Sequence, residues 1–120
     1  MQTRKWSAAV IVALGCVASS AYAVNIAGTS ASNVVNLDTY TQYGGGDVVF
    51  GLATNSLQAS CPGGFWIRAT DAGAKSTIAQ VLAAYQTGSP VMVWADIDAA
   101  SPHWSGSSAP TCLVWNVRNP

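Results

Sequence analysis

The strongest constraint on the fold is the segment 71–93, where a helix, a helix stop and a strand follow one another without a break. Apolar residues recur there at the i, i+3, i+4 and i+7 spacing of an amphipathic helix, which predicts one buried stripe. The helix is expected over about residues 75–87, with the stripe formed by Ile78, Val81, Leu82 and Tyr85. Gly88 suits the left-handed position after the last turn, and Pro90 prevents the helix from continuing.

The start of this helix and the strand behind it complete the pattern. Asp71 can supply an N-cap oxygen, and Ser76 is an alternative cap. Residues 91–97 alternate between two faces as a half-buried strand does, and the expected core face is Val91, Val93, Ala95 and Ile97. A helix that leads directly into a strand, with strand-like segments on both sides, predicts an α+β, mainly β fold whose helix packs on a sheet or barrel.

Residues 1–23 have the pattern of a secretory signal peptide. Arg4 and Lys5 precede an apolar run over residues 8–17, and the segment ends in the A-x-A sequence of a cleavage site. The apolar run is too short to span a bilayer comfortably, so an uncleaved membrane anchor is the weaker alternative. We therefore expect a single mature domain of residues 24–120, secreted or periplasmic and without a transmembrane segment.

The cysteines agree with export. Cys16 lies in the signal peptide, which leaves Cys61 and Cys112 as one pair in an oxidising compartment, where a disulfide is the expected state. Cys16 also resembles a lipidation site, but Ala13 stands where a bulky aliphatic residue is usual. Metal binding by the pair is a further alternative, although the chain has no C-x-x-C spacing and His103 is its only histidine. No metal ion and no cofactor are expected.

The charge of the mature domain excludes two classes of partner. The full chain has a net charge of zero, and loss of Arg4 and Lys5 leaves three basic side chains against five aspartates, a net charge of −2. The three basic residues are Arg68, Lys75 and Arg118. A mildly acidic domain lacks the basic stripe that binding to nucleic acid or to an anionic membrane surface needs.

The remaining strands are short and rich in β-branched and aromatic residues. They are expected at about residues 24–27, 34–37, 47–52, 65–69 and 111–117. Two loops, 39–47 and 98–110, separate some of them. Apolar residues such as Trp66 and Trp115 fall on the strand faces opposite the core, and this surplus of apolar surface favours oligomerisation.

One segment, AQVLAAYQTGSPVMV at residues 79–93, resembles a helix end and the following strand in the B subunits of pentameric AB-type toxins, most closely the subtilase-cytotoxin type. The resemblance implies a small OB-type barrel of about five or six strands with one helix, assembled as a homopentamer around a helix-lined pore. It also implies binding of host glycans or glycoproteins, with an A-type subunit as a further partner. The small helix face that would meet its copies around the pore is Ser76, Gln80, Ala83 and Thr87.

Catalysis has a weaker basis in the sequence. His103, Ser101 or Ser105, and Asp96 or Asp98 are the residue types of a hydrolytic triad, but no G-x-S-x-G motif frames either serine. The two aspartates could also offer oxygens to a calcium ion, yet the alternating ligands and closing glutamate of a calcium loop are missing. The sequence therefore predicts a protein that is not an enzyme.

Sugar recognition is better supported, because aromatic rings beside polar groups can stack on the apolar face of a pyranose and bond its hydroxyls. One candidate set is Tyr40, Tyr43 and Asp47, and the other is His103, Trp104 and Ser105. These aromatics equally suit packing of the fold or an interface. The sequence thus predicts a secreted glycan-binding module, with a periplasmic or secreted structural or inhibitory protein that binds another protein as the alternative.

Overall fold

The computed structural model describes residues 23–120, which form six β-strands and one α-helix. In chain order these are β1 (Ile26–Gly28), β2 (Val34–Thr39), β3 (Val48–Leu52), β4 (Phe65–Ile67), α1 (Ala74–Thr87), β5 (Met92–Asp96) and β6 (Cys112–Arg118). Residues 1–22 of the predicted signal peptide, Cys16 included, lie outside the described residues. No helix within residues 23–120 is long and apolar enough to cross a membrane.

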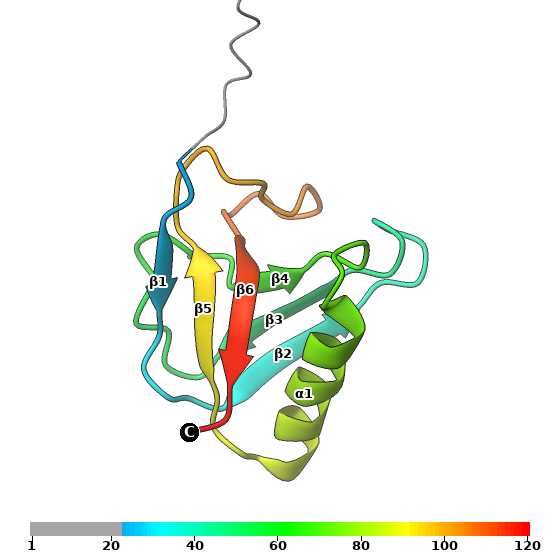
Figure 1. Cartoon of the computed structure of the whole chain (residues 1–120), viewed down its shortest axis with the longest axis vertical. Coiled ribbons are helices and arrows are strands. Elements are labelled where there is room, and N and C mark those ends of the chain that lie inside the picture. The colour runs from blue at the N-terminus through cyan, green and yellow to red at the C-terminus, as the bar shows by residue number, and fades with distance from the viewer. Residues whose placement is uncertain (1–22) are drawn as a thin grey trace, which may run out of the picture.

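The strands form one sheet in the order β1-β5-β6-β4-β3-β2. All neighbours are antiparallel except β4 and β6, which are parallel. The sheet is strongly bent, so that β1, β5 and β6 cross in front of β4, β3 and β2 while α1 lies beside the latter group (Figure 1). The predicted mainly β fold with one helix is confirmed. The sheet is open, however, because β1 and β2 remain as its two edges and do not pair with each other in the described chain.

A disulfide fastens the junction between the two halves of the sheet. Cys61 and Cys112 are bonded, with their Cα atoms 5.4 Å apart, as the cysteine pattern predicts. Cys112 is also the residue of β6 that pairs with Phe65 of β4. Between the bridge and β4 the chain turns at Gly64, where φ is +89° and an added Cβ would lie 2.5 Å from the Phe50 carbonyl oxygen. Only glycine fits this turn without strain.

The core lies between α1 and the inner face of the sheet. Alternate residues of the central strands point into it, since successive side chains of a strand face opposite sides. The core face predicted for β5 is confirmed, with Val91, Val93 and Ala95 fully buried and Ile97 packed against them. The largest fully buried side chains of the core are Phe50 of β3 and Phe65 of β4, whose ring centroids are 5.8 Å apart.

The ends of α1 follow the prediction at one terminus only. Gly88 caps the C-terminus in the left-handed conformation, with φ of 67°, as expected. At the N-terminus the predicted caps are wrong, because Gly73 occupies the cap position and makes no side-chain hydrogen bond. Asp71 is engaged elsewhere, since its Oδ1 accepts a hydrogen bond from Arg68 Nε at 2.9 Å.

The face that α1 buries also differs from the predicted stripe. Val81 and the small residues Ala74 and Ala84 are buried, whereas Leu82 is 40% exposed and Tyr85 49% exposed. The buried face of the helix therefore consists of Val81 and two alanines. Two of the four predicted stripe residues therefore form an apolar flank of the helix outside the core.

This placement predicts unequal costs for two adjacent truncations. Val81→Ala should lower the free energy of unfolding by about 2 kcal/mol, because two fully buried methyl groups are lost and a cavity remains. Leu82→Ala should change it by only about 0.5 kcal/mol in the isolated protomer, as surface substitutions do. Urea denaturation of both variants measures the difference. A loss of unfolding free energy for Leu82→Ala as large as that for Val81→Ala would instead support the buried stripe predicted from the sequence.

Candidate functional site

The two loops that carry the candidate sugar-binding residues meet on the outer face of the sheet. A second apolar cluster, distinct from the main core, lies there and consists of Trp66, Trp104 and Leu113, with Tyr40 and Val49 packed against it. The loop after β5 lies across one end of the sheet (Figure 1). The sequence presents the two loops as separate candidates, and the fold makes them one surface.

Three aromatic rings form the centre of this surface, which we call the aromatic platform: Tyr40, Tyr43 and Trp104. The Trp104 ring lies 4.7 Å from that of Tyr40 and 5.4 Å from that of Tyr43, measured between centroids. The Tyr43 contact is edge-to-face, a favoured geometry for aromatic pairs. Trp104 is buried beneath, whereas Tyr43 is 44% exposed. Tyr43 is thus the ring that the platform offers to solvent.

A hydrogen bond at the rim joins the two loops directly. The hydroxyls of Tyr43 and Ser105, 62 residues apart in the chain, are 2.8 Å apart and both exposed. Each hydroxyl combines one donor with two acceptor lone pairs, so both retain capacity for a further partner. The rim therefore places a polar pair beside an exposed ring.

Trp104 is held in place by backbone contacts of its own loop. The backbone N–H of Trp104 donates to Thr111 Oγ1 at 3.0 Å, and Trp66 Nε1 donates to the Pro102 carbonyl at 3.2 Å. Gly106 lies so close that an added Cβ would be 2.2 Å from the Trp104 ring. The indole Nε1 of Trp104 is buried and has no hydrogen-bond partner within residues 23–120. An unpaired buried donor is uncommon in folded proteins.

Asp47, predicted as a ligand-binding residue, instead supports the Tyr43 loop. It is buried, and its Oδ1 accepts a hydrogen bond from the backbone N–H of Ala69 at 2.9 Å. Its backbone carbonyl accepts from the N–H of Tyr40 at 3.0 Å. Gly44, with φ of +61°, passes so close to the Asp47 carboxylate that a Cβ would collide with it. The carboxylate is therefore occupied in shaping the loop.

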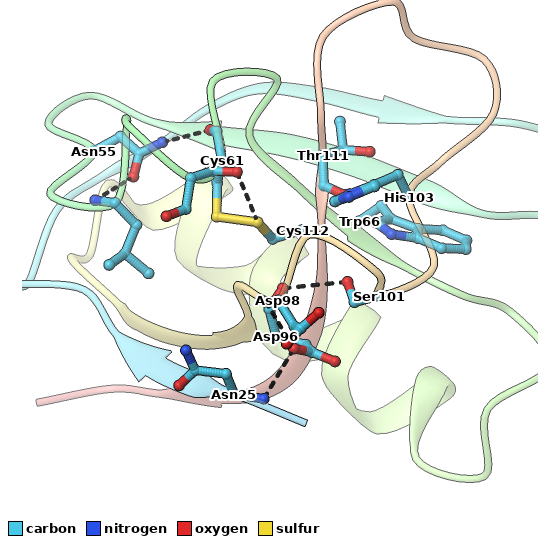
Figure 2. Close-up of a disulfide and its surroundings, with 12 residues drawn as sticks. Asn25, Asn55, Cys61, Trp66, Asp96, Asp98, Ser101, His103, Thr111 and Cys112 are labelled. Atoms are coloured by element: carbon cyan, nitrogen blue, oxygen red, sulfur yellow. Dashed lines mark hydrogen bonds between the residues drawn. A yellow bond between two sulfur atoms is a disulfide. The ribbon is translucent and has the colours of Figure 1, made fainter. Parts of the chain in front are cut away.

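His103 is also engaged by a backbone partner. Its Nδ1–H donates to the carbonyl of Thr111 at 2.9 Å, and the two residues lie side by side in Figure 2. The ring lines a separate cavity of about 500 Å³ together with Ser60, Ile97 and Pro110. Of the six predicted ligand-binding residues, four are brought together: Tyr40, Tyr43, Trp104 and Ser105.

The residue types of a hydrolytic triad are present but are not assembled. Ser105 is bonded to Tyr43, and the Nδ1 of His103 is used by a carbonyl. Asp96 is buried, and its Oδ1 accepts from the backbone N–H groups of Asn25 at 3.2 Å and Asp98 at 3.1 Å (Figure 2). The aspartates thus order the start of the 98–110 loop. No group of three or more potential metal ligands occurs in the part of the chain that the structure describes.

The supporting role of Trp66 was missed by the sequence reasoning. The signal was available, since Trp66 alternates with Phe65 and Ile67 and so must face away from the main core. It lies beneath the platform cluster, with the Arg68 guanidinium 5.9 Å above its ring. What the alternation could not reveal is the loop that covers it.

Comparison with known proteins found no matching family model, no matching curated protein and no matching solved structure. The geometry of the aromatic platform offers ring stacking and hydroxyl hydrogen bonds. The four residues that meet there include no charged side chain and no pair of nucleophile and general base.

Filling the space next to Trp104 should disrupt the platform. Gly106→Ala places a Cβ against the Trp104 indole, so the ring or its loop has to shift. This overpacking should lower the free energy of unfolding by about 1–3 kcal/mol. The shift of the ring should also alter the near-ultraviolet circular dichroism of tryptophan. Gly73→Ala is the matched control, because a Cβ there meets nothing within 4 Å. Equal spectra and stabilities for the two variants would contradict the packing described for Trp104.

Proposed function

We propose that this chain is a secreted or periplasmic, non-catalytic glycan-binding module whose ligand site is the aromatic platform. One observation carries the proposal: Tyr43 and Ser105, from loops far apart in the sequence, converge as an exposed ring with a pair of hydroxyls at its edge. The ligand-binding set is reduced to Tyr40, Tyr43, Trp104 and Ser105. Asp47 and His103 are excluded from it because each is committed to a backbone partner.

The chemistry of a sugar ring matches this arrangement. The C–H face of a pyranose can stack on the exposed Tyr43 ring, while its hydroxyls bond to Tyr43 Oη and Ser105 Oγ. Trp104 beneath the ring and the Tyr43–Ser105 bond fix the platform before a ligand arrives. Such preorganisation reduces the entropy lost on binding. The disulfide supports an oxidising compartment, where host glycans are also found.

The proposal includes a ring oligomer related to the B subunits of AB-type toxins, with their OB-type barrel and an A-type partner. Support comes from α1, whose outer face carries small and polar residues: Ser76, Gln80, Ala83 and Thr87. Three of these are exposed, and Gln80 Nε2 donates to Asn119 Oδ1 at 3.1 Å. The bent sheet with one helix against it is compatible with a small barrel whose edges, β1 and β2, have not closed.

A second candidate function is binding of another protein, as in a structural or inhibitory protein. The observation that favours it is the apolar flank of α1, where Leu82 and Tyr85 are both exposed. Exposed apolar side chains next to each other on a helix are a common element of protein interfaces. In a ring oligomer the same flank could be covered by the neighbouring subunit.

Substitution of Tyr43 tests the ligand site. After a glycan-array screen of residues 24–120 identifies an oligosaccharide, Tyr43→Ala should weaken its binding by about tenfold or more, since stacking is lost. Tyr43→Phe keeps the ring and removes one hydrogen bond worth about 1 kcal/mol, so a loss of about fivefold is expected. Calorimetric titration with the soluble oligosaccharide gives both values.

Tyr85→Ala is the control for this experiment, because Tyr85 is exposed to a similar degree but lies on α1. The Tyr85→Ala variant should bind the soluble oligosaccharide with the same affinity as the unmodified protein. Broad absence of glycan binding by a correctly assembled sample would overturn the glycan-binding proposal and favour the protein-binding alternative.

Substitution of Ala83 tests the assembly. Ala83→Glu adds one like charge per subunit to the proposed ring contact, and should shift the light-scattering mass from a closed oligomer towards the protomer while the fold is retained. Ala59→Glu, at an exposed alanine in the turn before β4, should leave the mass unchanged. A protomer mass for the unmodified protein, at concentrations well above micromolar, would remove the ring.

A further inference from the structure

A second concave surface lies where β4 ends beside β6, and none of the predicted site residues belongs to it. β4 stops at Ile67, whereas its parallel neighbour β6 continues to Arg118. The chain leaves the sheet after Ile67 to begin α1, which opens a groove of about 260 Å³ between the helix start and β6. Its walls include Arg68, Asp71, Thr77, Leu113 and Trp115. We call this the Trp115 groove.

Trp115 is placed in this groove by an irregularity of the sheet. The pairing of β5 with β6 passes from Trp94↔Asn116 to Ala95↔Val114, so Trp115 is an extra residue on β6 and forms a β-bulge. Bulges redirect side chains and are frequent beside functional sites. Trp115 is 62% exposed, the largest exposed fraction among the big apolar side chains of residues 23–120. An indole held on a rigid strand and open to solvent is a ready stacking surface.

The polar wall of the groove has the pattern that a pair of neighbouring hydroxyls requires. Arg68 Nε donates to Asp71 Oδ1 at 2.9 Å, and both side chains are about two-fifths exposed. This ion pair uses one nitrogen and one oxygen, so the two Nη groups and Oδ2 remain for a ligand. Thr77 Oγ1 donates to the Gly73 carbonyl at 3.0 Å and keeps its lone pairs for accepting. Donors and acceptors thus stand side by side next to the indole.

We infer that the Trp115 groove binds one pyranose unit with vicinal hydroxyls. The sugar face would stack on Trp115, one hydroxyl would donate to Asp71 Oδ2, and its neighbour would accept from an Arg68 Nη group. The groove volume of about 260 Å³ is smaller than the roughly 300–1,000 Å³ typical of pockets for drug-sized ligands, so it favours a small ligand. Opposite charges on Arg68 and Asp71 favour a neutral sugar over an anion. This inference rests on the proposed glycan-binding function, but it concerns a different site.

Tryptophan fluorescence tests the inference directly. Methyl glycosides of glucose, galactose and mannose are titrated into the protein while quenching by acrylamide is followed. Of the four tryptophans in residues 24–120, Trp115 is the exposed one, so a bound pyranose should lower its quenching by about twofold and shift emission to shorter wavelength. No change with any of the three glycosides would overturn the inference.

Matched variants separate recognition from fluorescence. Trp115→Phe keeps an aromatic face, so it should bind the active glycoside, detected by amide chemical shifts, without the fluorescence change. Trp115→Ala and Asp71→Asn should each weaken binding by about tenfold. Asp38→Asn, on the exposed end of β2, is the control and should bind normally. The groove is not a sugar site if all four variants bind the glycoside with equal affinity. The same conclusion follows if Trp115→Ala changes only the oligomeric mass and leaves the affinity unchanged.

These experiments distinguish the aromatic platform from the Trp115 groove. Loss of oligosaccharide binding in Tyr43→Ala, together with an unprotected Trp115, would overturn the groove and leave the aromatic platform as the ligand site. Retained binding in Tyr43→Ala with loss in Trp115→Ala would support the groove and overturn the platform. Absence of all sugar binding in the unmodified protein would overturn both.

Discussion

The fold depends on the short parallel contact between β4 and β6. Each half of the sheet is antiparallel, and only two registered pairs, Phe65↔Cys112 and Trp66↔Leu113, join the halves. The Cys61–Cys112 disulfide closes a loop of 51 residues at this junction, for which the chain-entropy model gives a stabilisation of about 4 kcal/mol. A contact this small would be a weak link without the covalent bond, since parallel pairing needs a long crossover and is slightly less stable per residue.

Both candidate sites follow from that junction. Because β4 has three residues and β6 has seven, the chain separates from β6 and leaves the Trp115 groove between the strand and α1. At the other end of the contact, the loop before β6 returns over the outer face and brings Trp104 onto Trp66. The same junction thus positions Trp104 over Trp66 and leaves Trp115 in the groove.

Local sequence patterns predicted the helix and the strands well. The predictions that failed depend on tertiary contacts. Gly88 and the alternation along β5 depend on neighbouring residues alone, so both were predictable. Leu82 was misplaced because the spacing of apolar residues does not reveal that Ala74 and Ala84 take the buried positions of the helix. The backbone partners of Asp47 and His103 could not be predicted, because residue type does not indicate which backbone groups the fold brings to these side chains. That the 39–47 and 98–110 loops form one surface could be seen only in the folded structure.

A shallow platform and a groove for one sugar ring each imply weak binding, because little ligand surface is removed from water at either site. Weak sites become useful when several copies act together, since a second contact made within one assembly proceeds at a high effective concentration and can raise avidity by about 10²–10⁴. The Tyr43 ring and Trp115 are exposed on the protomer at the same time, so neither site must be uncovered for the other to be occupied. The proposed ring would repeat both sites around one axis. In the proposed ring, assembly would therefore supply the affinity that a single proposed sugar site lacks.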